Sequence, residues 1–171
     1  TLWNSVEQTE KSNNSQLARE IELALPVELS REEQTRLVRE YCSSQFVSKG
    51  MCADFNIHDT GSGNPHAHIL LTMRPLDEKG AWAAKSKKEY VLDESGEKIL
   101  LPSGRYKTRK IDLMDWNRQE NADLWRKAWA DMANDFLEQN GSAERIDHRS
   151  NAERGIDEIP TVHMGVAACQ M

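Results

Sequence analysis

A turn-forming segment between two segments of alternating apolar and polar residues constrains the fold of this chain more than any other feature. Residues 60–65 contain two glycines, an asparagine and a proline, a combination typical of a tight turn. Apolar and polar residues alternate on both sides of it, over residues 51–58 and 64–73, which predicts two β-strands. The sequence therefore predicts an antiparallel β-hairpin.

Histidines gather in this hairpin. The chain has 5 histidines, and three of them fall between positions 58 and 68: His58, His66 and His68. Because strand side chains alternate between faces, His66 and His68 share one face, and the hairpin brings His58 beside His66. A single histidine on a strand is more often a packing or surface residue. Three on one face of one hairpin favour a divalent-metal site with a position left open for substrate.

Charge is unevenly distributed along the chain. At 171 residues the chain fits one domain, and its net charge of −6 argues against a nucleic-acid partner. Between Lys79 and Lys110, however, nine Lys and Arg against four Asp and Glu give a segment charge of +5 (9 − 4). This segment therefore predicts a basic surface on an otherwise acidic protein.

Cysteine use and the short apolar runs favour a cytoplasmic location. The 3 cysteines show no C-x-x-C spacing, so a reducing compartment is favoured over a disulfide framework. No apolar run is long enough for a membrane segment. The chain begins at Thr1 within a polar stretch, so we expect it to be part of a longer protein.

Local patterns before the hairpin predict a helix, a strand and a second helix. Residues 2–9 are expected to form a short helix, and residues 16–25 alternate as a strand that ends at a proline. Ser30 and Glu33 have the spacing of a capping box, which marks the start of a helix. This helix is expected to end near Gly50, with an apolar stripe of Leu37, Val38, Tyr41, Cys42 and Phe46.

A polar excursion follows the histidine hairpin. Over residues 77–111, two short apolar segments (90–92 and 99–101) flank an Asp-Glu-Ser-Gly turn. This pattern predicts a basic β-hairpin that projects from the domain.

The last part of the chain predicts a long helix and a final strand. Asp115 is expected to cap a helix that runs to Gln139, with a core stripe of Trp125, Trp129, Met132 and Phe136, supported by Leu124, Ala128 and Leu137. Residues 143–148 are expected to form the last strand. Together the elements predict an α+β fold, in which one antiparallel sheet has helices on its apolar face and the histidines on the other.

The motifs around the hairpin resemble those of a known family. With His-Ala-His on the third predicted strand, an earlier histidine eight residues upstream and Asn-Pro directly before it, the chain resembles the plasmid mobilisation relaxases of the MobA/MobL (MobQ) family. Their fold belongs to the His-hydrophobe-His endonucleases. Residues 18–26, 64–72, 145–150 and 160–165 match the family's segments in order. The resemblance implies one relaxase domain over residues 1–171 that lacks its N-terminal part.

The resemblance also implies an activity. Relaxases of this family nick one DNA strand at a plasmid transfer origin, and a tyrosine becomes linked to the 5′ phosphate. The implied metal ligands are His58, His66 and His68, with Mn²⁺ or Mg²⁺ as the ion. Glu20 and Glu22 are either a solvated strand face or the groups that orient a ligating imidazole through its other N–H.

The tyrosines depart from the family pattern. In relatives the nucleophile lies near the extreme N terminus, whereas Tyr41, Tyr90 and Tyr106 lie well inside this chain. We therefore expect the nucleophile and the first strand of the sheet to lie upstream of Thr1. The fragment alone is then expected not to nick DNA and to have an exposed sheet edge.

The implied partner is single-stranded or hairpin DNA of a transfer origin, together with accessory mobilisation proteins and a coupling protein. A charged run is often only a solvated face, but backbone charge and base stacking are also how relaxases hold a single strand. The candidate DNA contacts are Lys85, Lys87, Lys88, Arg105, Tyr106, Lys107, Arg109, Lys110 and Arg149.

Two other functions stay open at this point. One is a non-catalytic module that binds single-stranded or hairpin DNA and cuts nothing, which would account for the absent nucleophile. The other is an unrelated metal-dependent phosphodiesterase that uses a metal-bound water, for which Asp59 or Glu22 would serve as the general base.

Overall fold

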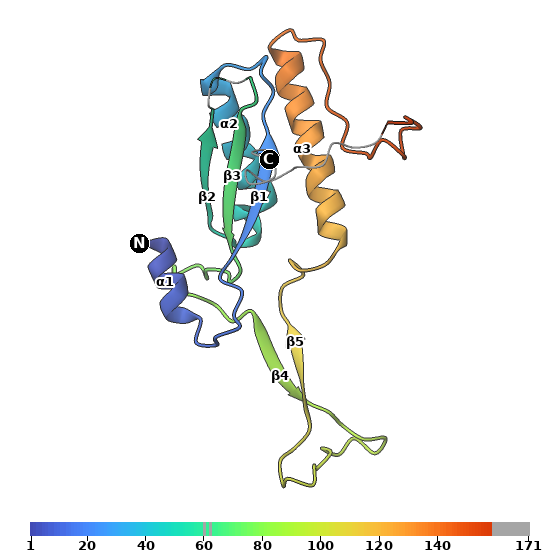
Figure 1. Cartoon of the computed structure of the whole chain (residues 1–171). Helices are drawn as coiled ribbons and strands as arrows, with labels where there is room; N and C mark the ends of the chain where they lie inside the picture. Colours follow the sequence, from blue (N-terminus) through green and yellow to red (C-terminus); the bar gives the residue numbers. More distant parts are fainter. Residues whose placement is uncertain (60, 62, 159–171) are drawn as a thin grey trace, which may run out of the picture.

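A computed structural model describes residues 1–59, 61 and 63–158 of the chain. In it a sheet is backed by two helices, and a thin arm extends from one end (Figure 1). The elements in chain order are α1 (Leu2–Thr9), β1 (Ala18–Ala24), α2 (Arg31–Gln45), a 3₁₀ turn (Val47–Lys49), β2 (Ala53–His58), β3 (His66–Thr72), β4 (Ser86–Tyr90), β5 (Thr108–Asp112) and α3 (Glu120–Gln139). None of the helices described here is both long and apolar enough to cross a membrane.

The predicted histidine hairpin is present. β2 and β3 pair antiparallel with His58 opposite His66, and β1 pairs antiparallel with the other side of β3. The resulting sheet has the order β1-β3-β2. On β3, Ala67, Ile69 and Leu71 are fully buried on the inner face, so the intervening histidines lie on the outer face.

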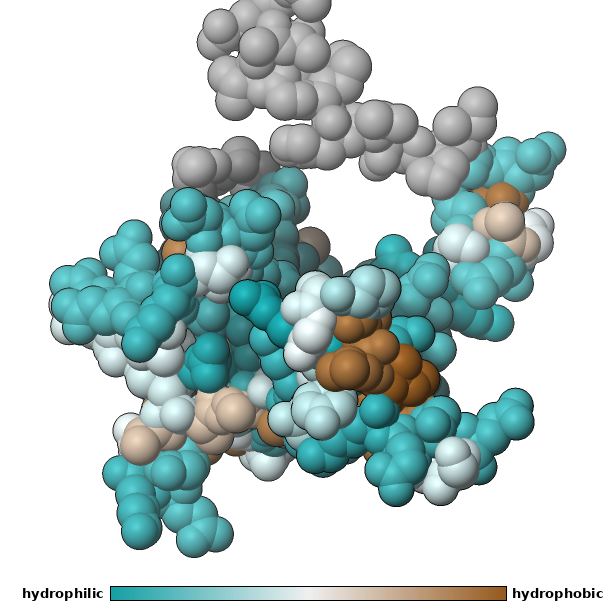
Figure 2. Space-filling view, turned by 90° about the horizontal axis from the view of Figure 1, so that it is seen from below, coloured by the Kyte–Doolittle hydropathy of each residue, from teal (hydrophilic) through white to brown (hydrophobic). Residues whose placement is uncertain are grey.

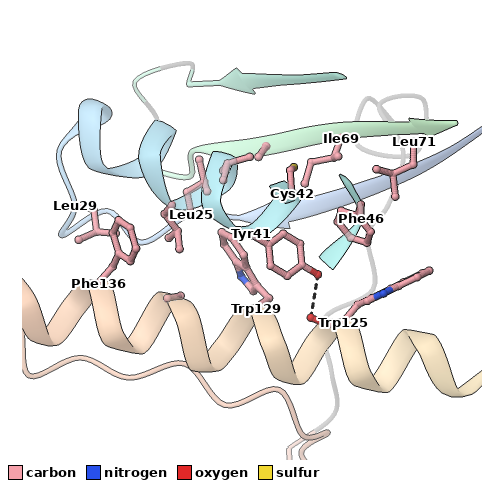
Figure 3. Packing of buried hydrophobic residues seen from close by; sticks show 14 of the residues in the cluster. Leu25, Leu29, Tyr41, Cys42, Phe46, Ile69, Leu71, Trp125, Trp129 and Phe136 are labelled. Carbon is pink, nitrogen blue, oxygen red and sulfur yellow. Dashed lines mark hydrogen bonds between the residues drawn. The ribbon is translucent and has the colours of Figure 1, made fainter. Parts of the chain in front are cut away.

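The inner face of the sheet is covered by α2, and α3 packs on α2 (Figure 3). Tyr41 of α2 makes edge-to-face contacts with Phe46 and Trp129, at ring-centroid distances of 5.3 and 5.2 Å. Its hydroxyl donates a hydrogen bond to the carbonyl of Trp125. The α+β class, the helix-covered face and the core role of these tryptophans are therefore confirmed.

The start of α2 is as predicted, and its end is close to the prediction. Ser30 accepts from the Glu33 backbone N–H while the Glu33 carboxylate accepts from the Ser30 backbone N–H, which is the complete capping box. The helix ends at Gln45 and a 3₁₀ turn carries the chain to Gly50. Gly50 has φ +92°, and a Cβ there would lie 3.2 Å from the Cβ of Pro75, so glycine is required.

The polar segment after the histidine hairpin forms a two-stranded arm over residues 85–113. The strands that pair in its main ladder differ from those predicted. β4 pairs antiparallel with β5, so the longest pairing joins the two lysine-rich segments. Around the predicted turn only Leu92 and Lys98 form a bridge, because the chain turns a second time and Leu100 bridges to Tyr106. The Asp93 carboxylate accepts backbone N–H groups of Ser95 and Glu97, which fixes the first turn.

Three expectations about the last part of the chain are wrong, and two of them concern the long helix α3. Asp115 is not the cap of α3, which begins at Glu120; the Asp115 carbonyl instead accepts a hydrogen bond from the Asn121 side chain. Leu124 is 60 % exposed rather than part of the core.

Residues 143–148 form no strand. The side chain of Asn134 in α3 bonds both the N–H and the carbonyl of Ile146, and these backbone groups are therefore used by a helix side chain rather than by a sheet. The signature at residues 160–165 lies outside the described residues.

Candidate metal centre and DNA-binding surface

The outer face of the sheet is a small grid of side chains set by strand register. Its top row is Ala24, His66 and His58; its middle row is Glu22, His68 and Asn56; its lower row is Glu20, Leu70 and Asp54. Each row joins one residue of β1, one of β3 and one of β2. Three imidazoles and three carboxylates therefore share one solvent-facing surface of a rigid sheet.

Two of the predicted ligands and one predicted carboxylate contact one another. The rings of His58 and His68 lie with centroids 4.6 Å apart. Nδ1 of His68 lies 2.9 Å from Oε1 of Glu20. With the proton on Nδ1 the imidazole donates to the carboxylate, and Nε2 is left with its lone pair as a metal donor.

His66 and Glu22 share this face without joining that cluster. Within residues 1–59, 61 and 63–158, no three histidine, cysteine or carboxylate side chains converge tightly enough to enclose a metal ion. His66 nevertheless lies directly across the ladder from His58, and Glu22 lies directly across from His68. The backbone thus puts the three imidazoles on neighbouring positions of one sheet face. Imidazole nitrogens and carboxylate oxygens are donors that suit a divalent ion.

The three tyrosines lie away from the histidines. Tyr41 is on the inner side of the sheet, and burial raises the pKa of its hydroxyl far above the ordinary value, so it stays protonated. Tyr90 and Tyr106 lie in the arm, with their rings edge to face at 5.8 Å. Neither arm tyrosine is on the sheet that carries the histidines (Figure 1).

The basic residues of the arm are divided between its two faces. Lys88 and Tyr90 point to one face of β4, and Lys110 lies directly opposite Lys88. Like charges placed in this way repel each other, so the pair favours a bound anion. Lys98 adds a third cation to this face, because its Nζ lies 4.1 Å from the ring centroid of Tyr90.

Several predicted DNA contacts, Lys110 among them, have acidic neighbours. Lys87 and Arg109 both approach Glu89 and lower the pKa of that carboxyl, and Lys110 pairs with Asp112. Arg105, Tyr106 and Lys107 lie exposed near the end of the arm. Seen from below, this end also carries an apolar patch (Figure 2), and Leu92 and Leu100 are among its exposed residues.

Two predicted contacts, Lys85 and Arg149, lie outside the β4–β5 ladder and the turns at the end of the arm. Lys85, at the base of the arm, has its Nζ 2.8 Å from the buried carboxylate of Glu10. Arg149 lies beyond α3, where its guanidinium is held at 2.7 Å by Asp147 and keeps the pKa of that carboxyl well below its usual range. Both cations therefore already have a protein partner.

Lys98, Trp3 and Asp54 were not among the predicted site residues. Trp3 of α1 donates its indole N–H to Asp54 on the outer face of β2, at 2.9 Å. The alternation of β2 placed Asp54 on the histidine face, but nothing local in the sequence linked it to a residue 51 positions away.

The fold and this histidine face define a MobA/MobL-type domain, and comparison with known proteins agrees. The model of the MobA/MobL family matches residues 1–171, and the chain therefore belongs to the MobA/MobL family. The resemblance drawn from the sequence motifs is thereby confirmed.

Similar proteins are named for conjugal transfer or mobilization. Conjugal transfer protein TraA of Agrobacterium fabrum is 40% identical over 168 residues, which cover 98% of this chain and 14% of that protein. The probable mobilization protein MobA of Bifidobacterium longum is 36% identical, over 98% of this chain and 32% of its own length. The chain thus spans about one seventh of the first relative and one third of the second.

A solved structure is similar as well. It is described as "Molecular Basis of Vancomycin Resistance Transfer in Staphylococcus aureus", with 34% sequence identity and a TM-score of 0.67. The match covers 87% of this chain and 66% of that one.

Proposed function

We propose that this chain is the DNA-nicking domain of a plasmid-transfer relaxase, and that it acts with a divalent metal, Mn²⁺ or Mg²⁺. The observation that supports the proposal best is the His58–His68 pair on the outer face of the sheet, with Glu20 against His68. Membership of the MobA/MobL family supports the plasmid-transfer role.

In this proposal His58, His66 and His68 hold the ion through neutral imidazole nitrogens. A divalent ion held there would supply Lewis-acid chemistry, polarising the scissile phosphate and offsetting the charge that develops on its oxygens. Glu20 accepts the Nδ1 proton of His68, and this fixes both the tautomer and the orientation of the ring. Glu22 adds negative charge beside the same ring.

The nucleophile is proposed to be a tyrosine of the parent protein outside these 171 residues. Tyr41 is unsuitable because it is buried and its hydroxyl is bonded to a backbone carbonyl. The proposed reaction transfers the DNA 5′ phosphate to that tyrosine and releases a 3′ hydroxyl. The fragment by itself is then expected to bind metal and DNA without nicking.

The arm is proposed to contact the backbone of single-stranded or hairpin origin DNA. Its cation-rich face, which we define as Lys88, Lys98 and Lys110 with Tyr90 and Tyr106, combines charge with aromatic rings. This combination suits an unpaired strand, because cations attract phosphates while rings stack on bases.

The test begins with calorimetric titration of Mn²⁺ into the chain and into its His58→Ala and His66→Ala variants. One site per chain that is lost in both variants is expected. Restoring the preceding segment of the parent should then give a covalent protein–DNA adduct on a cognate single strand with Mn²⁺ or Mg²⁺.

Two results would overturn the proposal in different ways. DNA binding that is indifferent to chelator and to His66→Ala, with no adduct, would favour a non-catalytic DNA-binding module. Cleavage of a generic phosphodiester by the chain alone would favour a hydrolase that uses a metal-bound water, with Asp59 or Glu22 as the base. Circular dichroism of each variant distinguishes loss of the site from loss of the fold.

A further inference from the structure

One aromatic side chain reaches the histidine face from outside the sheet. Trp3 of α1 donates its indole N–H to Oδ2 of Asp54, and this contact is exposed to solvent. Asp54 belongs to the same outer row of β2 side chains as Asn56 and His58. From Asp54 to His58 is four residues, or about 13 Å along a strand.

Contacts other than the indole also hold α1 in place. Val6 is the buried residue of α1. Ser5 accepts the indole N–H of Trp82, and Glu10, directly after the helix, binds Arg74 and Lys85. Trp3 itself is only half-buried, so part of its side chain stays exposed.

The surroundings of Trp3 suit the flat face of a nucleic-acid base. Leu70, directly opposite Asp54, is an apolar side chain in the lower row of an otherwise polar part of the face, and Glu20 lies on its other side. An aromatic ring and an aliphatic side chain offer the apolar contact that a base needs. Carboxylate oxygens accept hydrogen bonds from the amino groups of bases.

We propose that Trp3 is a stacking platform for an unpaired DNA base close to the nicked phosphate, and that Asp54 positions its indole. This inference rests on the proposed function, because it places the base on the same strand of DNA that the histidine face processes. It adds a binding subsite on α1, which is separate in sequence and in space from the cation-rich face of the arm (Figure 1).

The first measurement compares affinities for single-stranded DNA. The probe is a fluorescein-labelled single strand of about fifteen nucleotides with random sequence, and binding is followed by anisotropy with Mn²⁺ present. Trp3→Ala is expected to weaken binding about tenfold, and Trp3→Phe less than about threefold, because phenylalanine keeps a ring face. Leu124→Ala, which removes another exposed apolar side chain, is expected to change nothing.

The contribution of Asp54 is tested in the same assay. Asp54→Asn keeps an oxygen that can accept the indole N–H and is expected to bind DNA as the wild type does. Asp54→Ala removes the acceptor and is expected to weaken binding less than Trp3→Ala does. An Asp54→Ala variant with wild-type affinity would show that the carboxylate does not position the ring.

A second measurement does not depend on the folding of any variant. Thymine in the same probe is replaced by 5-iodouracil, and the wild-type complex is irradiated and digested. An adduct on Trp3 is expected, because a halogenated pyrimidine that stacks on an aromatic ring is held against it. Adducts on arm residues alone would overturn the inference.

The outcomes separate this inference from the proposed function. If the wild type binds the probe and His66→Ala abolishes Mn²⁺ binding, but Trp3→Ala keeps full DNA affinity, only the stacking platform is wrong. If Trp3→Phe loses as much affinity as Trp3→Ala and both melt early, the indole serves helix docking and the inference is again wrong. A wild type that binds no single-stranded DNA overturns both.

Discussion

At the scale of single residues, the contact between Glu20 and His68 bears on the proposed metal site, because it fixes one of the proposed ligand imidazoles. The carboxylate lies against Nδ1, so the ring cannot rotate or change tautomer without losing a hydrogen bond. Contacts of this kind act on affinity rather than on fold, because the side chain of Glu20 is itself 58% exposed.

Replacing Glu20 by Gln is therefore expected to weaken Mn²⁺ binding about 10- to 100-fold while the unfolding midpoint in urea stays unchanged. Calorimetric titration measures the affinity. Glu22→Gln is the matched control, since it removes the same charge from the neighbouring row and is expected to have a much smaller effect. Equal losses in the two variants would mean that charge alone matters, and not the hydrogen bond.

At the scale of elements, α2 is stabilised at its start by the reciprocal bonds between Ser30 and Glu33. Ser30→Ala is expected to lower the free energy of unfolding by about 1 kcal/mol, because an N-terminal backbone N–H loses its partner. Ser43→Ala, at an exposed position inside the same helix, is expected to leave stability unchanged or slightly raised, because alanine has the higher helix propensity. Urea unfolding of both variants checks this, and equal stabilities would contradict it.

Replacing Lys88 and Lys110, the two lysines that face each other across the arm, is expected to weaken DNA binding without disrupting the arm. In Lys88→Gln/Lys110→Gln the repulsion across the ladder disappears. The exposed ion pair of Lys110 with Asp112 is lost as well, but such a pair contributes little, so the arm itself should keep its stability. The slope of log affinity against log salt is expected to fall by about 1.4, or about 0.7 for each phosphate contact.

The matched control for the arm is Lys127→Gln in α3, where the lysine pairs with Asp131 and lies outside the arm. Its salt dependence is expected to equal that of the wild type. The same decrease in this control would show that only net charge matters.

Elements built from local patterns were predictable, and those decided by distant contacts were not. The alternation around residues 60–65 and the Ser30–Glu33 spacing are both readable within a few positions, and both predictions hold. The strand expected at residues 143–148 is absent because Asn134 bonds the backbone of Ile146, a tertiary contact that no local pattern reveals.

The candidate site likewise has residues that local patterns predict and residues that only distant contacts bring together. Strand alternation placed the histidines, Glu20 and Glu22 on one face, and the structure agrees on that face. Two other contacts depend on tertiary structure. Trp3 meets Asp54 because α1 packs beside β2, and Lys98 lies over Tyr90 because the turns of the arm bring them together. The sequence contains no periodic signal for either.

At the scale of the whole molecule, Glu10 connects three parts. Its carboxylate side chain is only 4% exposed and binds Arg74, just after β3, and Lys85, at the base of the arm. Burial by itself raises the pKa of Glu10, but the hydrogen bonds from Arg74 and Lys85 outweigh this effect and the pKa is lowered. The end of α1, the sheet and the arm are thereby held at one point.

Glu10→Gln is expected to loosen α1 and the arm base together while β1, β2 and β3 keep their hydrogen-exchange protection. Because the folded pKa lies below the ordinary value of 4.5, the carboxylate contributes stability above that pH and loses it as the pH falls. Wild-type protection in α1 should therefore fall on acidification, whereas that of the variant should not. Hydrogen exchange followed by mass spectrometry measures both, and loss of protection throughout the sheet would contradict the prediction.

The base of the arm has a consequence for how such proteins diversify. The two ends of the arm meet there, since the N–H of Leu113 donates to the carbonyl of Lys85 at 3.0 Å. A segment that leaves and re-enters a domain at one hydrogen-bonded point can be lengthened, shortened or exchanged with little strain on the rest. Under the proposed function, such changes would alter which DNA the arm meets while leaving the segment that carries His58, His66 and His68 untouched.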